Sequence, residues 1–301
     1  AFLFGLLLLL LFGQCGGAGL EFVEGDLSLE GEDPYQQPGM DSLPEEKRKA
    51  FHVVIIGAGM SGLLAAYRLK EADIPYTVIE KNPAVGGTWL ENTYPGCRVD
   101  SPNHTYSYSF LPKDWPQYYS PQKTLLEYFQ DFASESGVQE HVRFNTEVKS
   151  VVYDENDSEW TITVKTADGV YAIKANAVIG AVGQLNRHKL PDIEGRDTFR
   201  GPAFHTARWD HGHDLSGKRI GVIGTGASAF QSVPEIAKDA KDVFIFQRTP
   251  PWISIRPEYH DYVPDNKHWL LHHVPFYAKW FRFYIFWRSS EFRVFVGIIA
   301  A

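Results

Sequence analysis

Two glycine-rich loops constrain the fold of this chain more than any other feature, because each stands between an apolar run and a helical pattern. The first loop contains Gly57, Gly59 and Gly62 and follows the β-branched run of residues 52–56. Residues 63–70 have helical spacing, and the apolar run of residues 74–79 leads into Glu80. This order predicts a βαβ unit whose glycines admit a pyrophosphate at the helix N-terminus, while Glu80 accepts hydrogen bonds from a ribose. The predicted ligand is a dinucleotide.

A second unit of the same kind spans residues 218–246, with Gly224, Gly226 and Ser228 in its loop. Ala229 replaces the third glycine and is small enough for close packing of helix on strand. Arg248 follows the second strand, where the first unit has its acidic residue. A guanidinium binds a 2′-phosphate that a carboxylate would repel, so NADPH is predicted rather than NADH. Thr249 would add a hydroxyl contact, and the alternative is that Arg248 is a solvated charge at the strand end.

Composition limits the class of protein and its partners. With 301 residues, of which 44% are hydrophobic, the chain can bury a sizeable core and form two domains. A net charge of −8 argues against nucleic acid as the main partner, because phosphate binding requires a basic face. Cys15 and Cys97 lie far apart and predict neither a disulfide framework nor a metal site. These features favour a reducing compartment, and we predict a cytoplasmic protein.

The N-terminal region begins with an apolar run of Leu and Phe that belongs to neither nucleotide unit. The apolar run of residues 1–12 is shorter than the roughly 18 residues that a membrane span requires. Because no Lys or Arg precedes Lys47, it also lacks the basic start of a signal peptide. It predicts a buried helix of a longer N-terminal region, with a truncated signal or anchor as the alternative. Residues 13–46 predict a linker, and the start at Ala1 indicates a fragment.

The segment after Glu80 distinguishes between flavoprotein classes. Gly86, Gly87, Thr88 and Trp89 resemble the second glycine pair of flavoproteins, which lies along bound FAD. Disulfide reductases carry one redox cysteine directly after the Gly-Gly-Thr and a second five residues further on, and here these positions are Trp89 and Tyr94. A flavin-disulfide relay is therefore not expected, and Cys97 is predicted to be a small buried residue.

Residues 94–110 follow no regular period and predict a long functional loop. Its notable charges are Arg98 and Asp100, for which the alternative to a functional role is a local ion pair or turn caps. A helix is predicted next, with Ser120 as N-cap, Pro121 at its first position and Gly137 after its end. Its predicted apolar face consists of Leu125, Leu126, Phe129 and Phe132.

Residues 142–181 predict short strands, with a hairpin turn at Asp168 and Gly169. Residues 177–183 predict an apolar strand that runs into glycine, and they are similar to the stretch that returns to the FAD domain in flavoproteins. Residues 269–296 are aromatic with scattered basic residues. They predict helices of an inserted domain, and a helix on a membrane surface is the alternative.

Residues 199–210 lie between the two units, and their spacing fits neither a helix face nor a strand face. Phe199, Gly201, His205 and Trp209, followed by Asp210, match the FxGxxxHxxxW fingerprint of Baeyer-Villiger monooxygenases. The chain resembles this FAD- and NADPH-dependent family over residues 50–290. Within the family it is most similar to the 4-hydroxyacetophenone monooxygenase branch.

The resemblance implies an α/β fold with two dinucleotide-binding, Rossmann-like domains, FAD first and NADP second. A β-meander belongs to the first domain, and helical segments follow the second. The expected divisions are residues 1–49 as an N-terminal extension, 50–190 as the FAD domain and 191–301 as the NADP domain with the start of a helical insertion. The implied FAD contacts are Gly57, Gly59, Gly62, Glu80, Gly86, Gly87, Thr88, Trp89, Asp100 and Val148. The implied NADPH contacts are Gln184, Gly224, Gly226, Ser228, Arg248 and Thr249.

The implied reaction transfers hydride from NADPH to FAD, forms a C4a-peroxyflavin with O2, and inserts oxygen beside a ketone carbonyl to give an ester or lactone. Asp100, His205 and Trp209 are the implied catalytic residues. Asp100 would place an arginine from a segment beyond residue 301, whereas His205 and Trp209 would govern how NADPH and FAD come together. The alternatives are a monooxygenase that acts on nitrogen or sulfur, and a dinucleotide-binding chain without catalysis. No membrane partner is expected, and the sequence indicates no oligomeric state.

Overall fold

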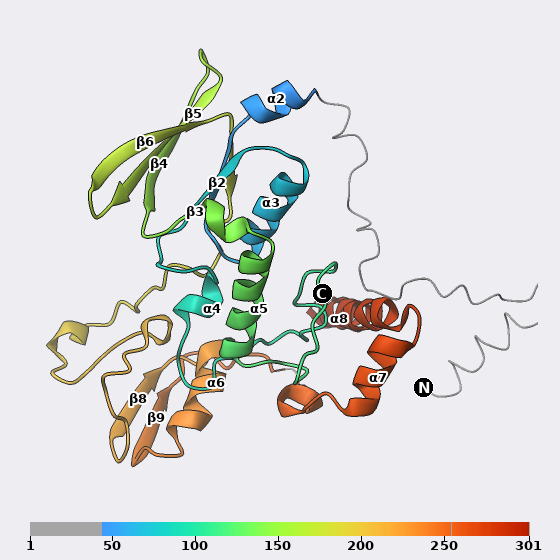
Figure 1. The fold of residues 1–301 in the computed structure, drawn as a ribbon. Coiled ribbons are helices and arrows are strands. Elements are labelled where there is room, and N and C mark those ends of the chain that lie inside the picture. Colours follow the sequence, from blue (N-terminus) through green and yellow to red (C-terminus); the bar gives the residue numbers. More distant parts are fainter. Residues whose placement is uncertain (1–43, 254, 301) are drawn as a thin grey trace, which may run out of the picture.

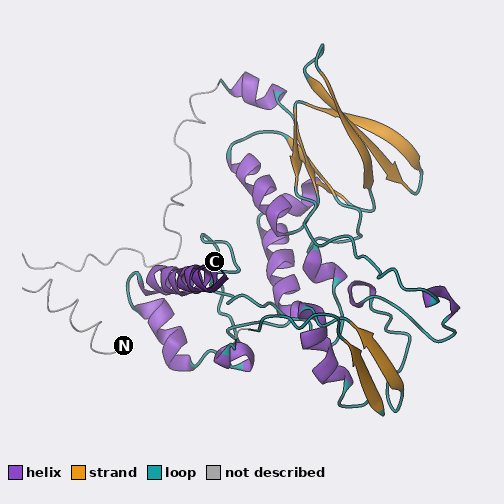
Figure 2. Ribbon diagram, turned by 180° about the vertical axis from the view of Figure 1, so that it is seen from behind, coloured by secondary structure: helices purple, strands orange, loops and turns teal. Residues whose placement is uncertain are grey.

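The computed structural model describes residues 44–253 and 255–300, with side chains as far as residue 288. The predictions for residues 1–12 and 13–43 therefore lie outside the described residues. The chain forms two nucleotide-type units and a pair of C-terminal helices (Figure 1). Figure 2 shows the strands in two separate groups, which correspond to these two units.

The first unit is built on a parallel sheet with the strand order β3-β2-β1-β7. Its strands are β1 (Val53–Ile56), β2 (Tyr76–Ile79), β3 (Val142–Arg143) and β7 (Ala177–Gly180). Helix α3 (Met60–Glu71) connects β1 to β2, as the first glycine loop predicts. β1 is almost completely buried, which explains its continuous apolar sequence.

The first unit has three layers, because the parallel sheet is covered on both faces. Val53 and Ile55 share a core with α3 and with helix α5 (Gln122–Glu135). Val54 belongs to a second core, which the sheet forms with the antiparallel β-meander. The meander consists of β4 (Glu147–Asp154), β5 (Glu159–Thr166) and β6 (Gly169–Ala175). The predicted β-meander is thus confirmed.

Two local predictions in this unit are wrong by one residue. Pro121, and not Ser120, occupies the N-cap of α5, because the Ser120 hydroxyl accepts a hydrogen bond from Asn103 Nδ2 at 2.6 Å. The hairpin turn consists of Ala167 and Asp168, because Gly169 already pairs with Thr166 as a strand residue. The predicted end of α5 is confirmed, since Gly137 follows it in the left-handed conformation.

The second unit contains β8 (Arg219–Ile223), α6 (Ala227–Ile236) and β9 (Asp242–Phe246). β8 and β9 pair in parallel over their whole length, as expected for a βαβ unit. Unlike β1, these strands are mostly exposed. The fold is therefore the predicted α/β arrangement with two Rossmann-like units, of which the first has the larger sheet.

Short helices connect or precede these elements. α2 (Glu45–Ala50) was not expected, since part of it falls in the predicted linker; Glu45 and Lys49 pair one turn apart at 2.8 Å and support it. The others are α4 (Thr88–Glu91), η2 (Val138–His141), η3 (Arg196–Thr198), η4 (Thr206–Arg208) and η5 (Pro257–His260).

Residues 265–300 form the C-terminal helices α7 (Asp265–His273) and α8 (Tyr277–Ala300), so the predicted helical segment is confirmed. The Arg282 guanidinium ties α8 to the first unit by donating to the carbonyl oxygens of His104 and Ser107 at 2.7 and 2.9 Å. Within residues 44–253 and 255–300, no helix is long and apolar enough to cross a membrane.

Candidate functional site

The first glycine loop is shaped by contacts that only glycine permits. Gly57 has φ +105°, and a Cβ there would lie 2.5 Å from the Ala181 carbonyl oxygen. A Cβ on Gly62 would lie 1.8 Å from the Gly57 carbonyl oxygen. Both distances are below van der Waals contact, so a larger side chain would displace the loop from β7 or from α3. The loop is thereby held at the carboxyl end of β1, where ligands of parallel sheets bind.

The second glycine pair packs directly on the first loop. The Gly86 amide donates to the Ala58 carbonyl oxygen at 3.0 Å. Gly87 has φ +53°, and a Cβ on it would lie 2.9 Å from the Gly59 Cα. Gly59 is also the N-cap of α3; no side chain of the described residues caps this helix, and its first turn contains no acidic residue. The N-terminal amides of α3 are thus suited to a phosphate, and this cradle fits a dinucleotide such as FAD.

Glu80 is buried and fixed beside the first loop. Its Oε2 accepts a hydrogen bond from the Ala58 amide at 2.7 Å, and its Oε1 accepts one from the Asn82 amide at 2.9 Å. Each carboxylate oxygen retains a second lone pair, so both can also accept ribose hydroxyls. The predicted ribose-binding residue therefore also orders the loop.

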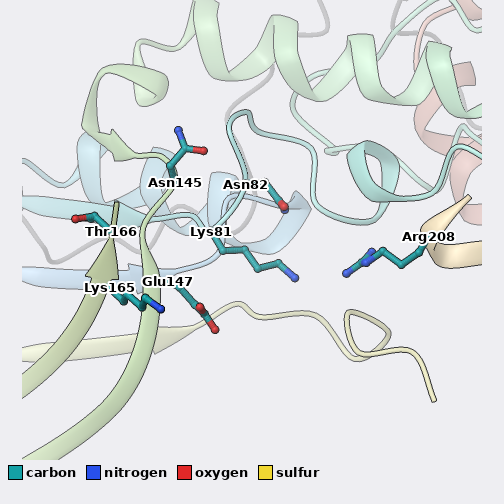
Figure 3. A pocket seen from close by; sticks show the side chains of 7 residues that line it. All are labelled: Lys81, Asn82, Asn145, Glu147, Lys165, Thr166 and Arg208. Atoms are coloured by element: carbon teal, nitrogen blue, oxygen red, sulfur yellow. The ribbon is translucent and has the colours of Figure 1, made fainter. Parts of the chain in front are cut away.

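A cavity of about 640 Å³ opens next to Glu80, between the end of β2 and the meander (Figure 3). Val148, the predicted FAD contact on β4, follows one of its lining residues in the chain. Three basic side chains and one acidic side chain face this cavity, which suits an anionic or nucleotide ligand. Its lining residues are Lys81, Asn82, Asn145, Glu147, Lys165, Thr166 and Arg208. Lys81 and Asn82 were detectable in the sequence only as neighbours of Glu80; Lys165 and Arg208 carried no signal.

The residues that follow the second glycine pair occupy different environments. Trp89 is buried and donates from Nε1 to the Tyr106 hydroxyl at 3.2 Å. Asp100 is exposed on the loop of residues 94–110. The Arg98 guanidinium binds the Tyr259 carbonyl oxygen at 2.8 Å and His260 Nδ1 at 2.7 Å. Among the described ion pairs none joins Arg98 to Asp100, so the alternative of a local ion pair is not realised.

Cys97 is buried in the core of the first unit, and burial raises the pKa of its thiol. A thiol in this environment is a poor nucleophile, because the thiolate is the reactive form. The interpretation of Cys97 as a small buried residue agrees with these observations.

The second glycine loop is open. Gly224 has φ +103°, and a Cβ on Gly224 or Gly226 would meet no described heavy atom within 4 Å. Gly226 is the N-cap of α6, and this helix also lacks a side-chain cap and first-turn acids among the described residues. Its N-terminus is therefore suited to a phosphate. Arg248 and Thr249 are exposed after β9.

The remaining predicted NADPH contacts lie apart from one another. Ser228 is partly buried in the first turn of α6. Gln184 is exposed in the segment that follows β7. The described contacts do not bring Gln184 together with the second glycine loop.

Residues 199–210, here called the fingerprint segment, form a compact local structure. The Phe199 ring covers Gly201, where a Cβ would approach ring atoms to 2.7 Å, so the phenylalanine and the glycine depend on each other. His205 is the N-cap of η4, and its Nδ1 accepts a hydrogen bond from the Ala207 amide at 3.1 Å. Trp209 packs against the core of the first unit. The segment thus docks on the first unit.

The pKa of His205 is lowered, first by burial and then by the neighbouring His188 and Arg208. The His205 ring lies 5.1 Å from that of His188 between centroids. Because Nδ1 accepts a hydrogen bond, the neutral imidazole carries its proton on Nε2.

An ion-pair network joins the fingerprint segment to α4. Arg208 Nη1 lies 3.2 Å from Glu91 Oε2, and Lys81 Nζ lies 2.9 Å from Glu91 Oε1. Burial would raise the pKa of Glu91, but hydrogen bonds from Asn82, Lys81 and Arg208 outweigh it and lower the pKa. In Figure 3, Lys81 and Arg208 extend toward each other from the two sides of the cavity. The sequence carried no signal for this network, since its members belong to unrelated segments.

Comparison with known proteins identifies relatives that match both nucleotide units of this chain. Residues 50–270 match the family model described as flavin-binding monooxygenase-like. A Baeyer-Villiger monooxygenase of Streptomyces coelicolor is 44% identical over 214 residues, which cover 70% of this chain and 40% of that protein.

The chain is also similar to solved structures of monooxygenases. A crystal structure of OTEMO in complex with FAD and NADP has a TM-score of 0.69 at 36% identity, covering 74% of this chain and 43% of that one. Cyclohexanone monooxygenase from Rhodococcus sp. Phi1, bound to NADP+, has a TM-score of 0.68 at 33% identity, with 74% and 42% covered. The chain spans about 40% of the length of the curated relatives that it matches.

Proposed function

The chain belongs to the flavin-binding monooxygenase-like family, and on this premise we propose that it serves an NADPH-dependent Baeyer-Villiger monooxygenase. The reaction would insert one oxygen atom of O2 beside a ketone carbonyl to give an ester or lactone. The observation that carries the proposal is the fingerprint segment, which is complete in sequence and docked on the first unit through Trp209 and Arg208. The similarity to enzymes of this name supports the same reaction.

FAD is the proposed ligand of the first unit. The α3 N-terminus with Gly57, Gly59 and Gly62 would hold its pyrophosphate, and Glu80 its ribose. The basic cavity beside Val148 and Lys81 would receive the adenosine end, and the segment from Gly86 to Trp89 would lie along the remainder. When bound, FAD supplies the redox chemistry and the activation of O2. The protein's own task is to position this group and exclude water.

NADPH is the proposed ligand of the second unit. The α6 N-terminus with Gly224, Gly226 and Ser228 would hold the pyrophosphate, and Arg248 and Thr249 would bind the 2′-phosphate. Gln184 is the proposed contact on the nicotinamide side. The exposed position of Arg248 at the end of β9 supports this role.

Arg248→Glu in the intact protein tests the cofactor assignment. A carboxylate would repel the 2′-phosphate, so the kcat/KM for NADPH should fall by about 100-fold while that for NADH changes little, in line with ~1.4 kcal/mol per factor of ten. The control is Lys241→Glu, which places the same charge on the same unit before β9. An equal loss with NADPH and NADH would contradict the assignment of Arg248.

Asp100, His205 and Trp209 keep their proposed catalytic roles. His205, neutral and hydrogen-bonded within η4, and Trp209, packed on the first unit, are suited to linking the two cofactor units rather than to proton transfer. Asp100 is exposed and free to orient a group brought to it from another segment. The proposed division into an FAD domain at residues 50–190 and an NADP domain at 191–301 agrees with this linking role.

The test of the reaction uses the intact protein with FAD, NADPH and a panel of cyclic and aryl ketones. Ester or lactone that incorporates one atom of labelled O2 is the expected product. NADPH consumption with sulfoxide or N-oxide as the only product would replace the proposal with heteroatom oxygenation. Membership of the 4-hydroxyacetophenone branch stays a prediction, and conversion of the aryl ketones in the panel would test it. Cell fractionation would test the predicted cytoplasmic location.

A further inference from the structure

A set of four hydrogen bonds lies between the two units, at Gln231 of α6. Its Oε1 accepts hydrogen bonds from the Tyr94 hydroxyl at 2.8 Å and from the Arg98 amide at 3.4 Å. Its Nε2 donates to the Arg98 carbonyl oxygen at 2.9 Å and to the Tyr259 hydroxyl at 2.7 Å. A carboxamide offers two donors and two acceptor sites, and here all four are used.

The backbone closes the same contact. Gly96 has φ +75°, and a Cβ on it would lie 2.3 Å from the Gln231 carbonyl oxygen and 3.0 Å from the Glu235 Cγ. The loop of residues 94–98 therefore touches the backbone of α6 at a place where no side chain fits between them.

A third element completes the junction. The Arg98 guanidinium lies over the Tyr259 ring, 5.3 Å from its centroid, and the Tyr119 ring lies 5.2 Å from the same ring. Gln231 thus touches the first unit through residues 94–98 and the segment after β9 through Tyr259. Segments far apart in the sequence meet at one side chain.

We propose that Gln231 is a positioning residue that clamps α6 against the first unit and so sets the distance between the two nucleotide sites. It follows the Gly226 N-cap by little more than one helical turn, so it fixes the N-terminus of α6 that faces the second ligand. Because hydride transfer depends steeply on geometry, a clamp at this place governs how productively NADPH meets FAD. The functional part of this inference rests on the proposed function; the clamp itself rests on the contacts alone.

The test compares Gln231→Leu with Gln139→Leu, which removes an exposed glutamine of the first unit. In Gln231→Leu, the amides of residues 94–98 and 227–236 should exchange hydrogen about tenfold faster or more, since four polar groups lose their partner. In the FAD-bound protein, flavin reduction at saturating NADPH should slow by about tenfold or more, because a misplacement of about 1 Å can cost ~100-fold. FAD affinity should change little.

Two milder variants keep the proposal testable if Gln231→Leu fails to fold. Tyr94→Phe and Tyr259→Phe each remove one hydrogen bond, and each should increase exchange in the same two segments by a smaller factor. Unchanged exchange and unchanged flavin reduction in folded Gln231→Leu would overturn the clamp. If exchange increases while the wild-type protein oxygenates no ketone, the clamp stands and only the proposed function fails.

Discussion

The two glycine loops have nearly the same sequence pattern but very different surroundings. In the first loop, a Cβ on Gly57 or Gly62 would collide with backbone at 2.5 or 1.8 Å. In the second, a Cβ on Gly224 or Gly226 would meet no described heavy atom within 4 Å. The strands behind them differ in the same way, since β1 is buried and β8 alternates between exposed and half-buried residues.

This difference shows that a glycine can be required at a loop position for two reasons, close packing or a positive φ. In the first unit, packing of the loop against β7 and the second glycine pair already requires glycine before any ligand is considered. In the second unit, the backbone of Gly224 requires positive φ, but the space above it is free. Ala229 at the third position agrees with this looser packing, because the corresponding Gly62 has no room for a methyl group.

The largest effect is expected from exchanging the third positions. Gly62→Ala should reduce the free energy of unfolding by more than about 4 kcal/mol, because its Cβ would overlap the Gly57 carbonyl oxygen. Ala229→Gly should cost only about 1 kcal/mol, which is the loss of helix propensity. Urea unfolding of both variants measures the difference.

Gly226→Ala is the matched control, because it adds a methyl group to the second loop where space is free. We expect a loss of ~1 kcal/mol or less, as for an unfavourable N-cap. If Gly62→Ala were as mild as Gly226→Ala, steric restriction would not distinguish the loops.

Lowering the pH should reduce stability by a smaller amount, and the cause lies in the first unit. Both ring nitrogens of His104 are buried, without a hydrogen-bond partner among the described residues, and the ring lies 5.1 Å from that of Phe281. Burial lowers the pKa of His104 from 6.5 to about 4; the charges of Lys267, His268 and Arg282 add to this shift, and Asp114 opposes it.

The folded protein therefore keeps His104 neutral where the unfolded chain is already protonated. Stability should be complete above pH 6.5 and fall as the pH is lowered from 6.5 to about 4. The total loss is ~3 kcal/mol, at about 1.4 kcal/mol per pKa unit. His104→Leu should flatten this part of the stability curve, whereas His213→Leu, on the exposed surface, should leave it intact; an unchanged slope in His104→Leu would refute the assignment.

The smallest effect concerns the link between the fingerprint segment and the first unit. Arg208 and Glu91 should show a coupling of about 0.5–1 kcal/mol in a double-mutant cycle of Arg208→Gln and Glu91→Gln. The Arg208 side chain is 45% exposed, so added salt should weaken the coupling. A coupling of zero at low salt would mean that the ion pair between Arg208 and Glu91 does not hold the segment to the first unit.

The local elements of this protein were largely predictable. Apolar runs and glycine positions identified β1, α3, β2, β8, α6 and β9, because a buried strand and an amphipathic helix each leave a distinct periodicity. One error of a single residue occurred where a side chain has a tertiary partner, as Ser120 has in Asn103, and the other where Gly169 joins the strand ladder opposite Thr166. α2 was missed, since its first two residues, Glu45 and Glu46, had been assigned to a linker.

The contacts between units were not predictable in the same way. Gln231, Arg208 and Glu91 stand at positions without a local signature, and their partners lie far away in the sequence. The basic cavity arises only because the end of β2, the meander and the fingerprint segment meet.

The sequence by itself determined the two βαβ units, the identity of the fingerprint segment and the contrast between Glu80 and Arg248. Each of these depends on short-range order along the chain, where periodicity, glycine and charge act directly on the backbone. Only the tertiary structure decided which glycines are sterically required, where Glu80 is held and how α6 is tied to the first unit. These depend on which distant atoms approach one another, because steric overlap and hydrogen bonding act over a few ångströms in space and not along the sequence.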